Sequence, residues 1–336
     1  MPQGEYLQYG GQAIVEGVMM RSPKYFAVAC RAPNGAIVVQ TEALEKTWIG
    51  RQNWLKLPFL RGTFALLDSM ALGIRSMRFA ANVQLDPVYA KPQEPAEKLP
   101  SKSIQNVTVA GAMIVGLGMG ILIFQYLPNL VAEMSRKAGV TNPTAINYIA
   151  EVLKVIFFLG YIGLIGLMKE VKTLFQYHGA EHKAINVLEA DEPLTSENCR
   201  AQTRLHPRCG TSFAMIVLIV GFILMPLVPR YPVTGGPGNP FVDVSVRVLV
   251  ELMILPLVAG ISYEALRVAG KFRNERWVKA AFAPGLASQY LTTREPTDDQ
   301  IEVARVSLEA VVRAEASGEL TNTVVSGPSL PEPQTG

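Results

Sequence analysis

With 336 residues, of which 49% are apolar and only 18% charged, the chain is too hydrophobic for an ordinary soluble protein. The formal net charge of +3 is too small to indicate a nucleic-acid-binding protein, and the three cysteines are too few for a disulfide framework. The composition instead fits a few membrane-spanning helices joined to water-soluble parts.

Residues 1–50 predict a small cytoplasmic unit that contains β-strands. The segments 13–20 and 25–41 are rich in Val, Ile, Tyr and Phe, and a Pro-Asn-Gly turn at 33–35 divides the second segment into a hairpin. The first thirty residues lack the basic-then-apolar pattern of a signal peptide, so we expect the N-terminus to stay in the cytoplasm.

Residues 51–102 predict an amphipathic helix followed by a linker. The segment 54–79 mixes apolar residues with charged ones such as Arg61 and Asp68, which is typical of a helix that lies on the membrane surface or dips into it. A core helix of the soluble part is the alternative interpretation. The segment 91–100 has the prolines and charges of a linker.

Residues 103–268 predict a membrane domain of four helices, since crossing a bilayer requires about 20 predominantly apolar residues. The expected spans are 103–132, 148–168, 211–228 and 246–268. Glu251 in the last span is expected to pair with Arg247, four residues earlier on the same helix face. Gly116 and Gly120 in the first span have the GxxxG spacing that lets helices pack closely, which would permit a homo-oligomer.

The distribution of basic residues predicts the orientation of these spans. The connections after the first and third spans hold Arg136, Lys137 and Arg230, whereas the termini and the remaining connections hold most of the Lys and Arg. By the positive-inside rule both termini and the connection 169–210 are cytoplasmic. The lipid bilayer is then the first partner of this chain, and its cysteines lie in a reducing compartment.

The C-terminal segment 269–318 is expected to be cytoplasmic and to contain an amphipathic helix. Thr297 and Gln300 have the spacing of a capping box, and an apolar stripe follows them as far as Gly318. The remaining residues 319–336 are polar and contain Pro and Ser, which predicts a disordered tail.

All three histidines lie within 29 residues of one another. His178 and His182 are four residues apart, so on a helix both rings lie on one face and can bind one metal ion. With Glu181 they form the order H-x-x-E-H, which is the pattern of the inverzincins. Glu181 would flank the two ligands and serve as the catalytic base, taking a proton from water at the metal.

His206 and Cys209 form a second candidate pair of ligands. Their separation by two residues, with Pro207 and Gly210 at the turn, is typical of a metal knuckle. The predicted metal ligands are therefore His178, His182, His206 and Cys209. Such a set of His and Cys favours zinc, although iron or another divalent metal also fits.

Two further residues could replace one of these ligands. Cys199 precedes His206, but the alternative is that its thiol is a small buried hydrophobe. Glu264, at the cytoplasmic end of the fourth span, could bind the metal or pair with a nearby basic residue. Gln12, Glu16 and Arg21 could line a substrate site if the β unit folds over the metal; alternatively they are polar residues on an alternating strand.

Four stretches of the sequence resemble the YqhQ-like family of bacterial membrane proteins. They are 9–21, 177–185, 205–213 and 291–303. The resemblance covers nearly the whole chain and implies a multi-pass protein of the bacterial inner (cytoplasmic) membrane, whose domain has an unknown function and is described as a predicted metal-dependent enzyme. The matching positions are His178, Glu181, His182, His206 and Cys209, whereas Cys199 is not expected to be shared.

The coordination number of the metal would separate the remaining functional hypotheses. If all four predicted ligands bind one ion, the site is structural, and the chain is a membrane scaffold or regulator. If one of them is absent, water can occupy a position, and the chain is a zinc-dependent hydrolase with an unknown substrate. A transporter with an incidental metal is the third hypothesis.

Overall fold

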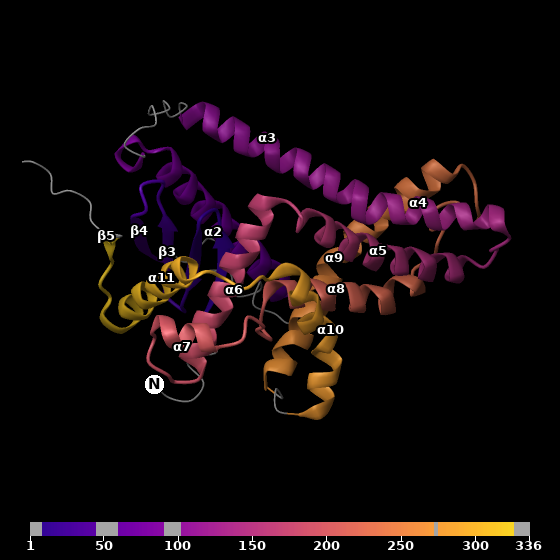
Figure 1. Ribbon diagram of the computed structural model, residues 1–336. Coiled ribbons are helices and arrows are strands. Elements are labelled where there is room, and N and C mark those ends of the chain that lie inside the picture. The colour runs from indigo at the N-terminus through magenta and orange to yellow at the C-terminus, as the bar shows by residue number, and fades with distance from the viewer. Residues whose placement is uncertain (1–8, 45–59, 91–101, 272–274, 326–336) are drawn as a thin grey trace, which may run out of the picture.

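A computed structural model describes residues 9–44, 60–90, 102–271 and 275–325. It consists of a layered part, which contains a β-sheet, and an elongated bundle of apolar helices (Figure 1). The sheet has five antiparallel strands in the order β1-β2-β3-β4-β5. These strands are β1 (Gly10–Ile14), β2 (Gly17–Arg21), β3 (Tyr25–Arg31), β4 (Ile37–Ala43) and β5 (Asn322–Val325).

The turn between β3 and β4 is the hairpin that the sequence predicts. Gly35 has a φ angle of +90°, which glycine adopts without steric strain, and Arg31 pairs with Ile37 across the turn. β5 differs from the sequence prediction, because residues 322–325 pair with β4 instead of belonging to a tail. The rest of the expected tail, 326–336, lies outside the described residues.

Helices cover both faces of the sheet, because its side chains alternate between two apolar clusters. Ala27 and Ala29 of β3 face α6, α7 and α11, whereas Phe26, Val28 and Cys30 face α2. The covering helices are α2 (Leu60–Leu85), α6 (Lys169–Glu189), α7 (Ser196–Ala201) and α11 (Asp298–Ser317), and a short helix η3 (Pro87–Tyr89) follows α2. The small β unit is thus the middle layer of an α/β/α arrangement.

The C-terminal amphipathic helix α11 has the ends that the sequence predicts. Thr297 and Gln300 form the capping box, and Gly318 ends the helix with a φ of +75°. The apolar face of α11 lies on the sheet, where the Ser307 hydroxyl donates to the backbone oxygen of Val18 at 3.1 Å. Residues from opposite ends of the chain therefore build one core.

Within the described residues, the bundle contains four helical stretches that are long and apolar enough to cross a membrane. They are Gly111–Ala138, Pro143–Ile165, Gly210–Leu227 and Pro240–Val268. The elements involved are α3 (Lys102–Ile121), the π-helical turn η4 (Leu122–Tyr126), α4 (Leu127–Met134), η5 (Ser135–Ala138), α5 (Pro143–Ile165), α8 (Gly210–Leu224), η6 (Met225–Leu227) and α9 (Pro240–Lys271). The number of these stretches and their order along the chain agree with the sequence prediction.

Charged side chains join the helices inside this bundle. Arg247 donates to Glu251 at 2.9 Å, which confirms the predicted pair. Lys154 of α5 lies 2.6 Å from Glu151 and 3.0 Å from Glu251, so its ammonium group connects α5 to α9. Asn129 of α4 also donates to Glu251 at 3.0 Å. These five buried residues neutralise and hydrogen-bond one another.

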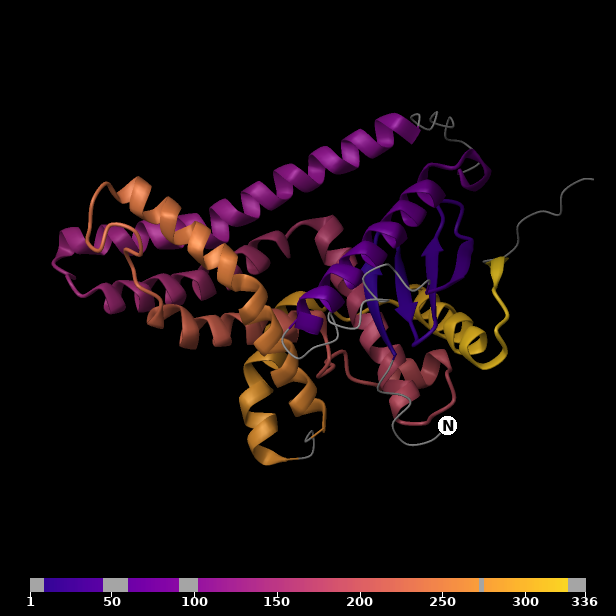
Figure 2. The same ribbon diagram turned by 180° about the vertical axis from the view of Figure 1, so that it is seen from behind.

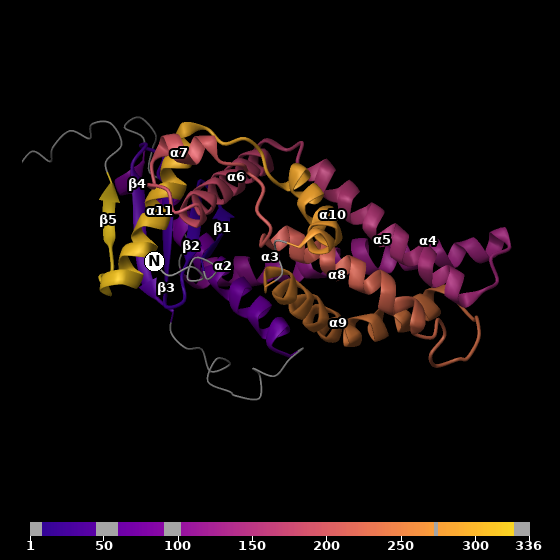
Figure 3. The same ribbon diagram turned by 90° about the horizontal axis from the view of Figure 1, so that it is seen from below.

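Two helices hold the layered part against the bundle. The helix α10 (Arg276–Thr292), which the sequence does not predict, packs on α8 (Figure 3). The N-terminal part of α2 packs on α9, as the view from behind shows (Figure 2). Here Gly62 faces Tyr263 so closely that a Cβ atom would lie 2.5 Å from that side chain. The Thr63 hydroxyl donates to the backbone oxygen of Pro256 at 3.0 Å.

Candidate metal centre

Helix α6 carries two of the predicted ligands on one face. His178 and His182 are one turn apart, and their ring centroids are separated by 4.4 Å. The segment after α10 crosses this helix closely, since a Cβ atom on Gly179 would lie 2.1 Å from the backbone oxygen of Arg294. This close approach brings backbone carbonyl groups next to the histidine rings.

Hydrogen bonds to backbone carbonyls orient both imidazoles. The Nδ1 atom of His178 lies 2.8 Å from the oxygen of Thr292, and that of His182 lies 2.6 Å from the oxygen of Arg204. Because a carbonyl oxygen only accepts, both Nδ1 atoms carry a proton, and in the neutral tautomer that this hydrogen bond selects the lone pair is on Nε2. A backbone carbonyl on the second ring nitrogen is a usual companion of a metal-ligating histidine.

The two Nε2 atoms have different surroundings. That of His178 lies 3.1 Å from the Sγ atom of Cys209. That of His182 is buried and has no hydrogen-bond partner among the side chains and backbone that the structure describes. Buried polar atoms are nearly always satisfied, so this nitrogen requires an explanation.

Cys209 reaches the histidines from the start of α8. Its side chain caps the helix, and Sγ accepts from the backbone nitrogen of Thr211 at 3.4 Å. This contact holds the sulfur at the N-terminus of α8, on the side of the two histidine rings. The ligand atoms of His178, His182 and Cys209 all lie within 4.8 Å of one another.

The structure does not bring His206 into this group. Its Nε2 atom lies 3.0 Å from a carboxylate oxygen of Glu189, which also binds Arg208. Gln289 of α10 clamps the backbone, accepting from the His206 nitrogen at 2.8 Å and donating to its oxygen at 2.7 Å. Burial lowers the pKa of His206, although the hydrogen bond that its ring donates to Glu189 acts in the opposite direction. Its ring lies beside that of His182, with centroids 5.7 Å apart.

Glu181 projects from α6 towards strand β1. Its carboxylate is buried against Gly11, where a Cβ atom would lie 2.8 Å from Cγ of Glu181. Burial raises the pKa of Glu181 to about 7, although the neighbouring His178 and a hydrogen bond with the Gly11 backbone act in the opposite direction. A carboxyl group that titrates near neutral pH is suited to proton transfer.

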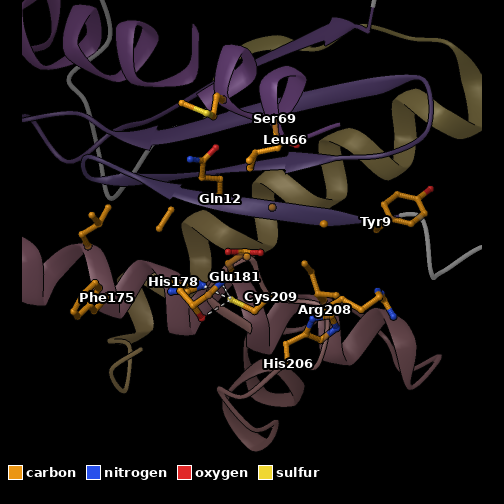
Figure 4. Close-up of a pocket in the computed structure, with 18 residues that line it drawn as sticks. Tyr9, Gln12, Leu66, Ser69, Phe175, His178, Glu181, His206, Arg208 and Cys209 are labelled. Atoms are coloured by element: carbon orange, nitrogen blue, oxygen red, sulfur yellow. Dashed lines mark hydrogen bonds between the residues drawn. The ribbon is translucent and has the colours of Figure 1, made fainter. Parts of the chain in front are cut away.

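A cavity of about 510 Å³ lies beside the ligand group, between strand β1 and helix α6. Strand β1 and helix α2 form one wall with Gln12, Leu66 and Ser69, and α6 and the start of α8 form the other (Figure 4). His178, Glu181 and Cys209 face this space from the α6 side. Two of the three grouped ligands and the candidate base therefore line a cavity large enough for a small molecule.

The two alternative ligands are engaged elsewhere. Cys199 is fully buried in the apolar cluster of α6, α7 and α11, and burial raises the pKa of its thiol to about 11. Glu264 accepts two hydrogen bonds from Arg61 of α2, one of them at 2.6 Å. The thiol thus packs as a small hydrophobe, and the carboxylate pairs with a basic residue.

The three polar residues of the N-terminal motif have separate roles. Gln12 lines the cavity, as expected if the β unit folds over the site. Glu16 accepts a hydrogen bond from the Tyr177 hydroxyl at 3.2 Å. Arg21 lies 3.7 Å from Asp68 of α2. Of these three residues Gln12 lines the cavity, and Glu16 and Arg21 tie the sheet to neighbouring helices.

Several residues that shape the site were missed in the sequence. The carbonyls of Thr292 and Arg204 have no sequence signal, because any residue type could supply them. Glu189 had a sequence signal, because its spacing places it on the same face of α6 as the histidines. It lies two turns after His182 and three turns after His178. Gln289 belongs to α10, whose interior Pro284 obscures the helical pattern.

Comparisons with known proteins place the chain in a family. The family described as "Protein of unknown function (DUF1385)" matches residues 57–314. The chain belongs to this family. It is also 36% identical to "Uncharacterized protein YqhQ" of Bacillus subtilis (strain 168) over 313 residues, which cover 93% of this chain and 94% of the relative. This identity confirms the resemblance to the YqhQ-like family, and no solved structure matches the chain.

Proposed function

We propose that this member of the family is a membrane-bound, metal-dependent hydrolase, with zinc held by His178, His182 and Cys209. The observation that carries the proposal is the buried Nε2 atom of His182, which has no hydrogen-bond partner within the described ranges. Leaving such a group unsatisfied costs about 1–3 kcal/mol. A cation at the point where the three ligand atoms converge would remove this penalty.

The donor set fits zinc in number and in chemistry. Two imidazoles and one thiolate are its usual ligands, and three protein ligands are the number found in catalytic sites that keep the fourth position open. A zinc ion so bound would polarise a carbonyl or phosphoryl oxygen and lower the pKa of water. The hydrogen bonds of His178 and His182 to backbone carbonyls hold both rings in the required tautomer.

Glu181 is the base of this proposal. During hydrolysis the oxygen of a water molecule bonds to the acyl carbon or phosphorus of the substrate, and its proton passes to Glu181. The same proton then goes to the leaving group, so that the carboxylate is restored. The Gly11 backbone orients the carboxylate, and the cavity beside it admits the substrate.

The proposal includes the membrane orientation that the basic residues predict. The four apolar helices cross the bacterial cytoplasmic membrane, both termini are cytoplasmic, and the site faces the cytoplasm. A structural zinc site, as in a scaffold or regulator, would need a fourth protein ligand. His206 is the nearest candidate by sequence, but its side chain binds Glu189.

Metal analysis of the purified full-length protein tests the proposal. We expect one zinc per chain, and cobalt substitution should give a thiolate-to-cobalt absorption band that disappears in Cys209→Ser. Acetohydroxamate should shift the visible cobalt bands because it binds at an open position. Glu181→Gln should retain the metal, and His206→Gln is the matched control for His182→Gln.

Three results would overturn the proposal. The protein could carry no stoichiometric metal, or His206→Gln could lose the metal as completely as His182→Gln does, which would indicate a closed four-ligand site. Cobalt bands that do not respond to acetohydroxamate would also indicate a structural metal. Loss of metal in Glu181→Gln would remove the base assignment.

A further inference from the structure

The metal ligands lie on α6 and at the start of α8, and both places adjoin the apolar helices of the bundle. Cys209 precedes Gly210, the first residue of the apolar stretch Gly210–Leu227. Helix α6 begins at Lys169, shortly after the apolar helix α5 ends at Ile165. The candidate metal centre therefore lies at the end of the membrane bundle rather than deep within the layered part.

Helix α2 links the cavity to the bundle at the depth of the bilayer. Thr63 binds the backbone oxygen of Pro256, which lies 12 residues before the end of the apolar stretch Pro240–Val268, or about 18 Å along the helix. Leu66 and Met70, one and two turns after Thr63 on the same helix face, line the cavity. The cavity wall is thus continuous with a surface that contacts a membrane-spanning helix.

The cavity has an apolar and a polar end. Leu174 and Phe175 lie in the second turn of α6, near the bundle, whereas Tyr9 and Arg208 lie at the opposite end (Figure 4). Leu66 is 40% exposed, although apolar side chains in water gain from burial. An apolar ligand that enters from the bilayer would cover this surface.

We propose that the substrate is a membrane amphiphile, whose apolar chain lies along Leu66, Met70 and Phe175 while its hydrolysable polar head reaches the metal centre. This inference rests on the proposed function and names its substrate class. The polar head would meet Gln12 and Ser69 of the opposite wall and the Arg208 end of the cavity. The substrate would thus bind without leaving the membrane surface.

Alkyl hydroxamates test the hydrolase proposal and the substrate class separately. The hydroxamate head binds an open metal position, and the alkyl chain probes the apolar wall of the cavity. In the cobalt-substituted, full-length protein, the shift of the visible bands gives the affinity for acetohydroxamate and octanohydroxamate. Each buried methylene contributes about fourfold in affinity. If about half of the six additional methylenes are buried, octanohydroxamate binds about 60-fold more tightly.

Neighbouring leucines supply the matched control. Leu66→Gln should weaken octanohydroxamate about tenfold, roughly the loss of one to two buried methylenes, and leave acetohydroxamate unchanged. Leu67→Gln should change neither affinity, because Leu67 is equally apolar and exposed but does not line the cavity. Partition of the long chain into detergent is the same for all three proteins and cancels in the comparison.

The outcomes distinguish the two proposals. If acetohydroxamate binds but chain length has no effect, or if Leu66→Gln and Leu67→Gln behave alike, the amphiphile assignment is overturned and the hydrolase proposal stands. If a peptidyl hydroxamate of equal apolar area binds more tightly than the alkyl compound, the cavity belongs to a hydrophobic peptide. If no hydroxamate shifts the cobalt bands, the hydrolase proposal itself fails.

Discussion

Adjacent glycines of β1 allow a quantitative test of how Glu181 is positioned. A Cβ atom on Gly11 would lie 2.7 Å from the backbone oxygen of Met19 and 2.8 Å from Cγ of Glu181. A Cβ atom on Gly10 would have no neighbour within 4 Å. Neither glycine has a positive φ angle, so alanine fits the backbone conformation at both positions.

The two substitutions to alanine should have opposite effects on stability. Gly11→Ala overfills the space between β2 and α6 and should cost about 1–3 kcal/mol, since the oxygen of Met19 belongs to a paired strand and cannot move away alone. Gly10→Ala should be neutral or stabilise by about 0.4–1 kcal/mol, because it restricts the unfolded chain.

Thermal unfolding of the zinc-loaded proteins in one detergent is the assay. At about 2 °C per kcal/mol, Gly11→Ala should lower the Tm by roughly 2–6 °C, while Gly10→Ala should not lower it. Both variants should retain one metal ion, because the atoms nearest to a Cβ atom on Gly11 belong to Met19 and Glu181. Equal Tm values for the two variants, or loss of metal in Gly11→Ala, would refute this account of the contact.

Two further predictions concern the bundle and its contact with α2. Lys154→Met should destabilise the protein by about 3–5 kcal/mol, because it leaves Glu151 and Glu251 without this cation. Glu151→Gln should lower the free energy of unfolding by less, because Lys154 still pairs with Glu251. Equal losses for the two variants, measured by unfolding in detergent, would contradict this arrangement. Gly62→Ala should lower the Tm, because the new methyl group would lie 2.5 Å from Tyr263; an unchanged Tm would mean that α2 and α9 do not pack this closely.

Helical periodicity and pair spacing made part of the site predictable. His178 and His182 had to share a face of any helix, and Cys209 follows a turn signal at the start of an apolar stretch. Spacing did not determine where the ring of His206 would point. That depended on Glu189, which lies on the same helix face and binds the imidazole.

The fold shows the same division between local and distant information. The hairpin at Gly35 and the capping box at Thr297 were readable because a few adjacent residues determine them. Strand β5 and the contact of α2 with α9 depend on partners far away in the sequence. Polar composition alone could not reveal that residues 322–325 would find an open strand edge.

The lysine that joins α5 to α9 has a consequence for how the protein is made. Helix α5 leaves the ribosome with Glu151 and Lys154 already able to neutralise each other, but α9 is synthesised about a hundred residues later and carries Arg247 and Glu251. In the proposed membrane arrangement Arg247 neutralises Glu251 within α9, and Glu251 gains the hydrogen bonds of Asn129 and Lys154 only when α4 and α5 lie beside α9. If the four helices cross a membrane as proposed, they should therefore assemble together rather than as independent spans.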